Sequence, residues 1–114
     1  MPFKIANHGG RYLYVDDDNQ IQADHNYDLS RPPSDLASKG TVFDTGKQHQ
    51  LVTNKGPVKY NMGGTPIDLQ LEQINADEYV IRTSRGKHYL FSGLESIRVE
   101  DQVGPMGIFT VVNE

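Results

Sequence analysis

The chain has 114 residues, of which 36% are hydrophobic, and its formal net charge is −4. This length fits one compact domain. The negative charge argues against a nucleic-acid binder, whose footprint is a basic stripe, and the absence of cysteine excludes disulfides and thiolate zinc sites. The sequence contains no run of about 18 apolar residues, so it predicts no transmembrane helix. The N-terminus lacks the apolar core of a signal peptide. We expect a soluble, cytoplasmic protein without membrane contact; secretion without a signal stays open.

Short β-branched or aromatic stretches follow one another along the chain, each bounded by Gly, Pro, Asn, Asp or Ser. In chain order these predicted strands are 12–15, 42–43, 50–53, 69–71, 79–81, 89–91, 97–99 and 108–112. No window shows a 3.6-residue apolar period with helix caps. The segment 28–39 is the exception, a longer polar loop with one helical turn expected after Pro33. The sequence predicts an all-β protein.

One short pattern occurs three times: Asn or Ser, then His or a basic residue, then Gly. The copies are Asn7-His8-Gly9, Asn54-Lys55-Gly56 and Ser84-Arg85-Gly86. Each follows an aliphatic strand end and precedes a strand with Tyr, and around a closed chain the mean period is about 38 residues. Three mostly strand repeats, roughly 1–39, 40–76 and 77–114, describe a single β-trefoil domain over residues 1–114, a six-stranded barrel with three capping hairpins.

Closure of such a threefold barrel makes two further predictions. The segment 108–112 should pair with 3–6, so that neither terminal strand leaves an exposed sheet edge. The second repeat is irregular, because the stretch 61–66 stands where a hairpin is expected. One strand of that repeat should therefore be short or lost.

The threefold pattern without a Gln-x-Trp motif resembles two groups of trefoil proteins. The stretch HGGRYLYVDDDNQIQAD (8–24) is similar to the Gly-Lys/Arg-Tyr-Leu strand and turn of the fascin and hisactophilin type. The stretch LQLEQINADEYVIRT (69–83) resembles the central strand-turn-strand of the mushroom trefoil protease inhibitors, the mycocypins and mycospins. GIFTVVNE (107–114) stands where their closing strand does. This second resemblance implies a fungal protease inhibitor.

Protease inhibition through rigid surface loops is the leading hypothesis, because a rigid loop loses little conformational entropy on binding. In the mushroom inhibitors a second-repeat loop can carry an Asn or Lys that engages asparaginyl or trypsin-like proteases, and a first-repeat loop helps block papain-like clefts. The resemblance thus implies a primary loop of Asn54, Lys55 and Gly56. It implies a second surface of Asn7, His8, Gly9 and Gly10, with the stiff loop of Arg31, Pro32 and Pro33 beside it. The alternative for each is a plain hairpin turn or surface connector.

Carbohydrate binding is the first alternative function. Trefoil lectins typically hold a sugar with an Asp, an amide and an aromatic platform. Here these would be Asp24, Asn26 and Tyr27, or Asp101 with Gln102. The absence of tryptophan counts against this hypothesis, although Tyr can also stack on a sugar; otherwise Tyr27 packs and Asp24 occupies a turn. The second alternative is a fascin-like, actin- or cytoskeleton-associated module that uses Lys4, Lys87 and Arg98.

Catalytic and metal motifs are not evident in the sequence. The stretch 16–19, Asp-Asp-Asp-Asn, offers oxygen ligands of the kind calcium prefers, but it lacks the glycine and distal glutamate of an EF-hand, which favours a solvated turn. The four histidines lack zinc-ligand spacing, and no nucleophile elbow, phosphate loop or paired-carboxylate motif occurs. We expect no enzyme, no cofactor and no metal, and a monomer or weak homodimer whose partner is a protease or a glycan.

Overall fold

The computed structural model describes residues 1–22, 40–85, 88–92 and 97–114. Over these ranges the protein is all-β, which confirms the predicted class. Its strands are β1 (Phe3–Ala6), β2 (Tyr14–Val15), β3 (Ile21–Gln22), β4 (Asp44–Thr45), β5 (Leu51–Thr53), β6 (Gly56–Pro57), β7 (Lys59–Met62), β8 (Thr65–Asn75), β9 (Glu78–Thr83), β10 (Tyr89–Ser92), β11 (Ile97–Glu100) and β12 (Thr110–Asn113), with 3₁₀ turns η1 (Lys47–His49) and η2 (Pro105–Gly107). This described part contains no helix whose length and apolar character suit a membrane span.

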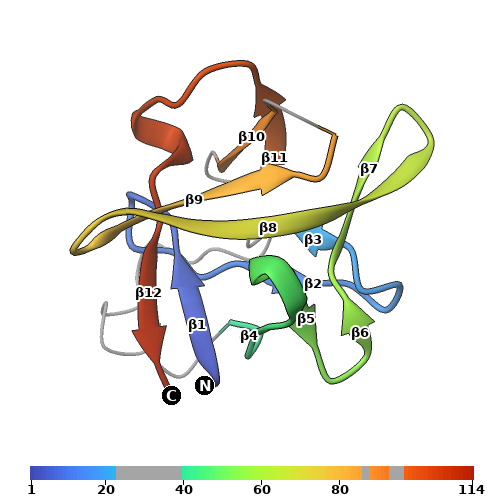
Figure 1. Cartoon of the computed structure of the whole chain (residues 1–114), viewed down its shortest axis with the longest axis horizontal. Helices are drawn as coiled ribbons and strands as arrows, with labels where there is room; N and C mark the ends of the chain where they lie inside the picture. The colour runs from blue at the N-terminus through green and yellow to red at the C-terminus, as the bar shows by residue number, and fades with distance from the viewer. Residues whose placement is uncertain (23–39, 86–87, 93–96) are drawn as a thin grey trace, which may run out of the picture.

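The first and last strands lie side by side (Figure 1). β1 pairs antiparallel with β12, from Phe3 opposite Asn113 to Ala6 opposite Thr110. This confirms the predicted pairing of the two terminal segments. The pairing gives each strand a hydrogen-bonded neighbour where it would otherwise present an open edge.

The other pairings lead from β1 around the molecule and back to it. β4 pairs with β5 and β8 pairs with β9, both antiparallel. Three isolated bridges join these pairs and the β1–β12 pair: Phe3 with Phe43, Gln50 with Gln70, and Tyr79 with Phe109. Within the described residues, strand pairs and single-residue bridges therefore follow one another in a circle, while the strands themselves form four separate sheets.

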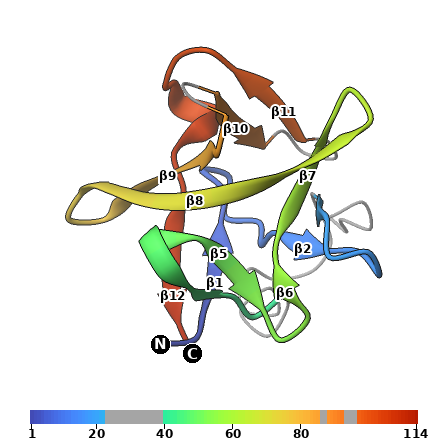
Figure 2. The ribbon, with the colours of Figure 1, turned by 45° about the vertical axis from the view of Figure 1, so that its right-hand side comes forward.

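Three antiparallel hairpins, β2–β3, β7–β8 and β10–β11, add to this circle. The expectation of a short or lost strand in the second repeat is wrong, because β7 and β8 pair from Lys59–Asp68 to Met62–Thr65. Gly63 and Gly64 form the turn with φ of 57° and 91°, the left-handed conformations that a tight hairpin turn requires. Figure 2 shows β8 crossing the molecule, with the β7 hairpin at one end and the β9 hairpin at the other.

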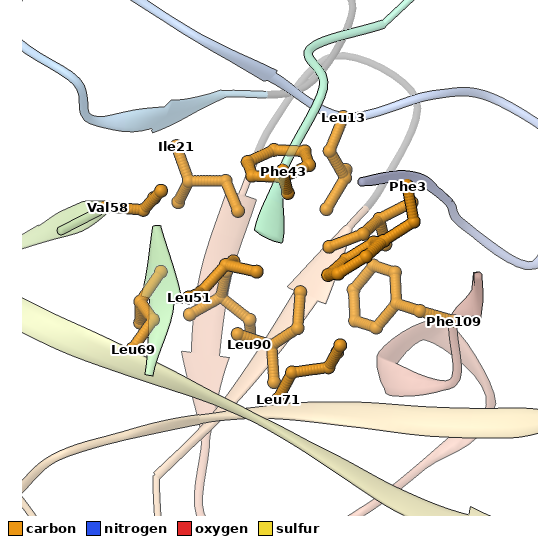
Figure 3. Close-up of a cluster of buried hydrophobic side chains, with 12 residues drawn as sticks. Phe3, Leu13, Ile21, Phe43, Leu51, Val58, Leu69, Leu71, Leu90 and Phe109 are labelled. Atoms are coloured by element: carbon orange, nitrogen blue, oxygen red, sulfur yellow. The ribbon is translucent and has the colours of Figure 1, made fainter. Parts of the chain in front are cut away.

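The hydrophobic core lies between these strands. The side chains labelled in Figure 3 come from segments far apart in the sequence and point toward one another. The Phe3 and Phe43 rings stack with centroids 6.5 Å apart. The core cluster consists of Phe3, Ile5, Leu13, Ile21, Phe43, Leu51, Val58, Leu69, Leu71, Ile81, Leu90 and Phe109. Its members range from residue 3 to residue 109, so the core brings together segments that are far apart in the sequence.

The turn between β4 and β5 holds two consecutive non-glycine residues in the left-handed conformation, Gln48 at φ 54° and His49 at φ 61°. Gln50 N donates to Lys47 O across them, and Asn-Gly is the preferred central pair of such a turn. We expect the double variant Gln48→Asn, His49→Gly to be more stable by roughly 1 kcal/mol, because it relieves the side-chain crowding. Urea unfolding checks this, with Gln48→Ala as a control that keeps the strain. A double variant no more stable than the wild type contradicts it.

Candidate functional site

The second predicted loop is a tight turn between β5 and β6. Thr53 and Gly56 are register partners, so the chain reverses over Asn54 and Lys55 alone. Both of these side chains are exposed. Gly56 has φ of 111°, a conformation that glycine adopts without steric penalty. The turn thus places the two residues predicted to engage a protease at its tip.

Asn19, in the turn between β2 and β3, holds this loop from outside. Its Nδ2 donates to Gly56 O and to Pro57 O, each at 2.9 Å, and its Oδ1 accepts from Thr53 Oγ1 at 2.7 Å. The residue is 7% exposed, and its own N donates to Asp16 O at 3.0 Å. We call the three side-chain bonds the Asn19 clamp. They use both ends of one amide to hold the two arms of the loop together.

Sequence reasoning placed Asn19 in a solvated turn and missed this role. The residue has φ of 61°, and Asn tolerates this left-handed conformation better than most residues do. The Asn at the end of the acidic turn 16–19 therefore indicated a left-handed backbone conformation at this position. The bond from its side chain to Pro57, 38 residues further on, had no signal in the local sequence.

The turn that carries Asn19 is ordered by the Asp16 carboxylate. Oδ1 accepts from the backbone N–H groups of Asp18 and Gln20, each at 2.9 Å, and Oδ2 accepts from Gln22 Nε2 at 3.1 Å. Burial alone would raise the pKa of Asp16, but these hydrogen bonds and the charge of Lys55 outweigh it and hold the pKa below its ordinary value. The carboxylate therefore stabilises the turn. This agrees with the interpretation of residues 16–19 as a turn rather than a calcium-binding loop.

The lowered pKa of Asp16 predicts a pH-dependent contribution to stability. Because the folded-state pKa lies below the unfolded value of about 3.9, the contribution is fully present above that pH. It is lost as the pH falls through the folded-state pKa. We expect Asp16→Asn to be less stable than the wild type at neutral pH, with the difference shrinking below about pH 4. Urea unfolding at several pH values checks this. Asp18→Asn, in the same turn, is the control and should keep the wild-type profile; an Asp16→Asn deficit that does not change with pH contradicts the prediction.

The first predicted loop is organised by Asn7, which is 5% exposed. Its Oδ1 accepts from the backbone N–H groups of Gly9 and Arg11, at 2.9 and 3.0 Å, and its Nδ2 donates to Ser92 Oγ at 3.2 Å. Asn7 therefore supports the loop from within. His8 and the two glycines after it are exposed, so they are the part of this predicted surface that a partner can touch.

In the third copy of the pattern, Ser84 and Arg85 are exposed, and Ser84 N donates to Asp68 O at 2.9 Å. Each of the three loops is thus bonded to another element of the fold: the first to β10, the second to the β2–β3 turn and the third to β8. Several predicted residues lie outside the described ranges: Asp24, Asn26, Tyr27, Arg31, Pro32, Pro33, Gly86 and Lys87.

Two hollows lie beside predicted site residues. The larger, of about 610 Å³, adjoins the β5–β6 turn and is lined by Pro2, Thr41, Val42, Phe43, Asp44, Val52, Thr53 and Asn54. The smaller, of about 360 Å³, is lined by Phe91, Glu100, Asp101, Gln102 and Val103. His88 Nδ1 lies 3.3 Å from Asp101 Oδ1 near this second hollow. The structure thus brings the predicted pair Asp101 and Gln102 together with an aromatic ring.

The basic positions of the cytoskeletal hypothesis are partly engaged elsewhere. The Lys4 side chain is 9% exposed, with Nζ 3.7 Å from Glu114 Oε2. Arg98 Nε bonds Glu100 Oε1 at 2.8 Å, and its guanidinium lies 5.4 Å from the centre of the Phe91 ring. Lys4 is therefore largely buried and Arg98 is ion-paired, which does not favour a basic actin-binding surface.

The described residues contain no group of three His, Asp or Glu side chains placed to hold a metal ion. Searches of the whole sequence against protein-family models and against curated proteins both find no match.

Proposed function

We propose that the protein is a β-trefoil with repeats near 1–39, 40–76 and 77–114. The circle of strand pairings supports this, because Gln50–Gln70 lies within the second repeat, Tyr79–Phe109 lies within the third, and Phe3–Phe43 joins the first repeat to the second. Each proposed repeat also contains one of the three hairpins. Each of the three loops contacts the repeat that precedes it around the circle. Such a barrel would fold independently of its loop tips and leave them free to vary for binding.

We propose further that the protein is a non-catalytic inhibitor of a protease, acting through the β5–β6 turn. The observation that carries this proposal is the Asn19 clamp, which holds a two-residue tip whose side chains, Asn54 and Lys55, are exposed. A loop ordered before binding loses little conformational entropy when a partner engages it. The Asn54 amide would enter the pocket of an asparaginyl endopeptidase, and the Lys55 ammonium would suit the acidic pocket of a trypsin-like enzyme.

The first loop supplies the second contact surface of this proposal. His8, Gly9 and Gly10 are exposed and lack bulk apart from the one imidazole, which suits entry into a narrow papain-like cleft. Asn7 keeps them in place through its bonds to Gly9 N and Arg11 N. The two activities would thus reside on separate loops of one rigid domain.

The test is an inhibition assay with papain, an asparaginyl endopeptidase and trypsin. We expect at least one of them to be inhibited by micromolar protein in a saturable way. The Asn61→Ala variant, which alters an exposed residue of β7 next to a different turn, serves as a control and should inhibit as the wild type does. Full activity of all three enzymes at micromolar protein would contradict the proposed function.

Carbohydrate binding is a second candidate, favoured by the hollow around Phe91, Asp101 and Gln102. Carboxylate and amide groups can bond sugar hydroxyls, and an aromatic ring offers an apolar surface to the sugar. A glycan array tests it, with the double variant Asp101→Ala, Gln102→Ala expected to lose any binding that the wild type shows. Silence of the wild type across galactosides and chitooligosaccharides counts against this candidate.

A further inference from the structure

The β5–β6 turn contains two peptide bonds that proteases of the proposed target classes can cut. Asn54–Lys55 follows an asparagine, and Lys55–Gly56 follows a lysine. Exposed loop tips are preferred sites of proteolytic nicking. A ligand that offers such bonds at its tip should therefore become a substrate unless something prevents cleavage.

The geometry of the turn prevents it. A protease aligns a peptide bond for hydrolysis by binding the residues around it as an extended segment. Here Thr53 is paired with Gly56 and Val52 with Pro57, so the chain folds back on itself within two residues. Neither bond can enter an active site in extended form while these pairs persist. Cleavage requires local opening of the turn, and its rate follows the population of the open form.

The backbone ladder alone holds this turn weakly. Pro57 has no N–H to donate to its partner strand, and β5 and β6 are joined by two register pairs. The Asn19 clamp adds three side-chain bonds, of which two go to the carbonyls of Gly56 and Pro57 and one comes from Thr53 Oγ1. Asn19 is also nine-tenths buried, so its bonds are shielded from competition with water.

We infer that Asn19 is a positioning residue that keeps the turn closed, so that the protein engages its protease as an uncleaved ligand rather than as a slow substrate. This inference rests on the proposed function, because it takes a protease as the partner. Its structural half, resistance of the Lys55–Gly56 bond to cleavage, depends only on the clamp.

The experiment uses trypsin as the probe and the full chain as wild type and as Asn19→Gly. Glycine accepts the left-handed φ of 61° that position 19 has, so this substitution removes the side-chain bonds without adding strain. Denaturing mass spectrometry during the digestion follows the nick after Lys55 through the masses of the fragments 1–55 and 56–114, which separate because the chain has no cysteine to join them. We expect Asn19→Gly to be cut there at least about tenfold faster than the wild type, which corresponds to losing three hydrogen bonds of modest net strength.

Two further variants separate local positioning from general destabilisation. Asn61→Ala removes a single exposed bond to another turn, from Gly64 N to Asn61 Oδ1, and should be cut after Lys55 no faster than the wild type. Thr53→Val keeps the shape of its side chain and removes the bonds that Thr53 Oγ1 makes with Asn19 and with Lys55 N. Its rate of cleavage after Lys55 should lie between those of the wild type and Asn19→Gly.

The inference is overturned if the wild type is cut after Lys55 as fast as Asn19→Gly. It is equally overturned if folded Asn19→Gly and Thr53→Val both resist cleavage there. Failure of the inference and failure of the proposed function look different. A wild type that inhibits trypsin yet is cut after Lys55 refutes the clamp's role alone. A wild type that resists this cut but inhibits none of the three enzymes refutes the inhibitor function, and with it the half of the inference that names a protease partner.

Discussion

Asn54→Ala should weaken inhibition of an asparaginyl endopeptidase by at least about thirtyfold, as expected when an anchor residue worth about 2 kcal/mol is lost from an interface. The side chain is exposed at the tip of a two-residue turn and takes no part in the Asn19 clamp. Its removal should therefore leave the loop in place and delete only the group that enters the enzyme's pocket. Inhibition constants for the wild type and the variant measure this.

The same variant should inhibit papain as the wild type does, because that activity is assigned to the loop with His8, Gly9 and Gly10. Lys55→Ala is the complementary change and should weaken inhibition of trypsin. Asn61→Ala is the matched control, an exposed Asn of β7 whose side chain bonds Gly64 in the β7–β8 turn. Equal inhibition of the asparaginyl endopeptidase by Asn54→Ala and the wild type would remove Asn54 from the proposed site. Parallel loss of all activities would indicate damage to the fold rather than to one contact.

Phe43→Ala should lower the free energy of unfolding by about 3–5 kcal/mol, the range measured when a buried Phe is truncated. The side chain is 1% exposed, and its ring stacks on Phe3 at 6.5 Å, so the variant loses apolar burial and an aromatic contact together. Position 43 also carries two backbone hydrogen bonds with Phe3. The cavity would lie beside one of the three bridges that complete the circle of strands.

Urea unfolding followed by circular dichroism checks this prediction through a lower midpoint at an unchanged slope. Val42→Ala is the matched control. Val42 is adjacent to Phe43 in the sequence but is 42% exposed. Truncation of such a residue should change the free energy of unfolding by no more than about 0.5 kcal/mol. A Phe43→Ala variant within about 1 kcal/mol of the wild type would mean that the core can collapse around the deleted ring.

Much of the fold was predictable because local chemistry decides it. Aromatic and β-branched stretches favour strands, and the Gly, Asn and Asp residues between them favour turns. Seven of the eight predicted strands overlap an observed one, and the eighth, 42–43, lies directly before β4. The repeat pattern also predicted the pairing of β1 with β12 that the structure shows. The β7–β8 hairpin was misjudged, although Gly63-Gly64 is itself a signal for a tight hairpin turn.

The candidate site also has features that the local sequence predicts and features that depend on tertiary packing. The sequence by itself determined the exposed tips, because residues such as His8, Asn54 and Lys55 follow a strand end in a turn pattern that recurs. Only the tertiary structure decided how the tips are held. Asn7 bonds Ser92, 85 residues away, and Asn19 bonds Gly56 and Pro57, 37 and 38 residues away. An amide side chain can bond any backbone group within reach, and which groups are within reach depends on how distant segments of the chain pack together.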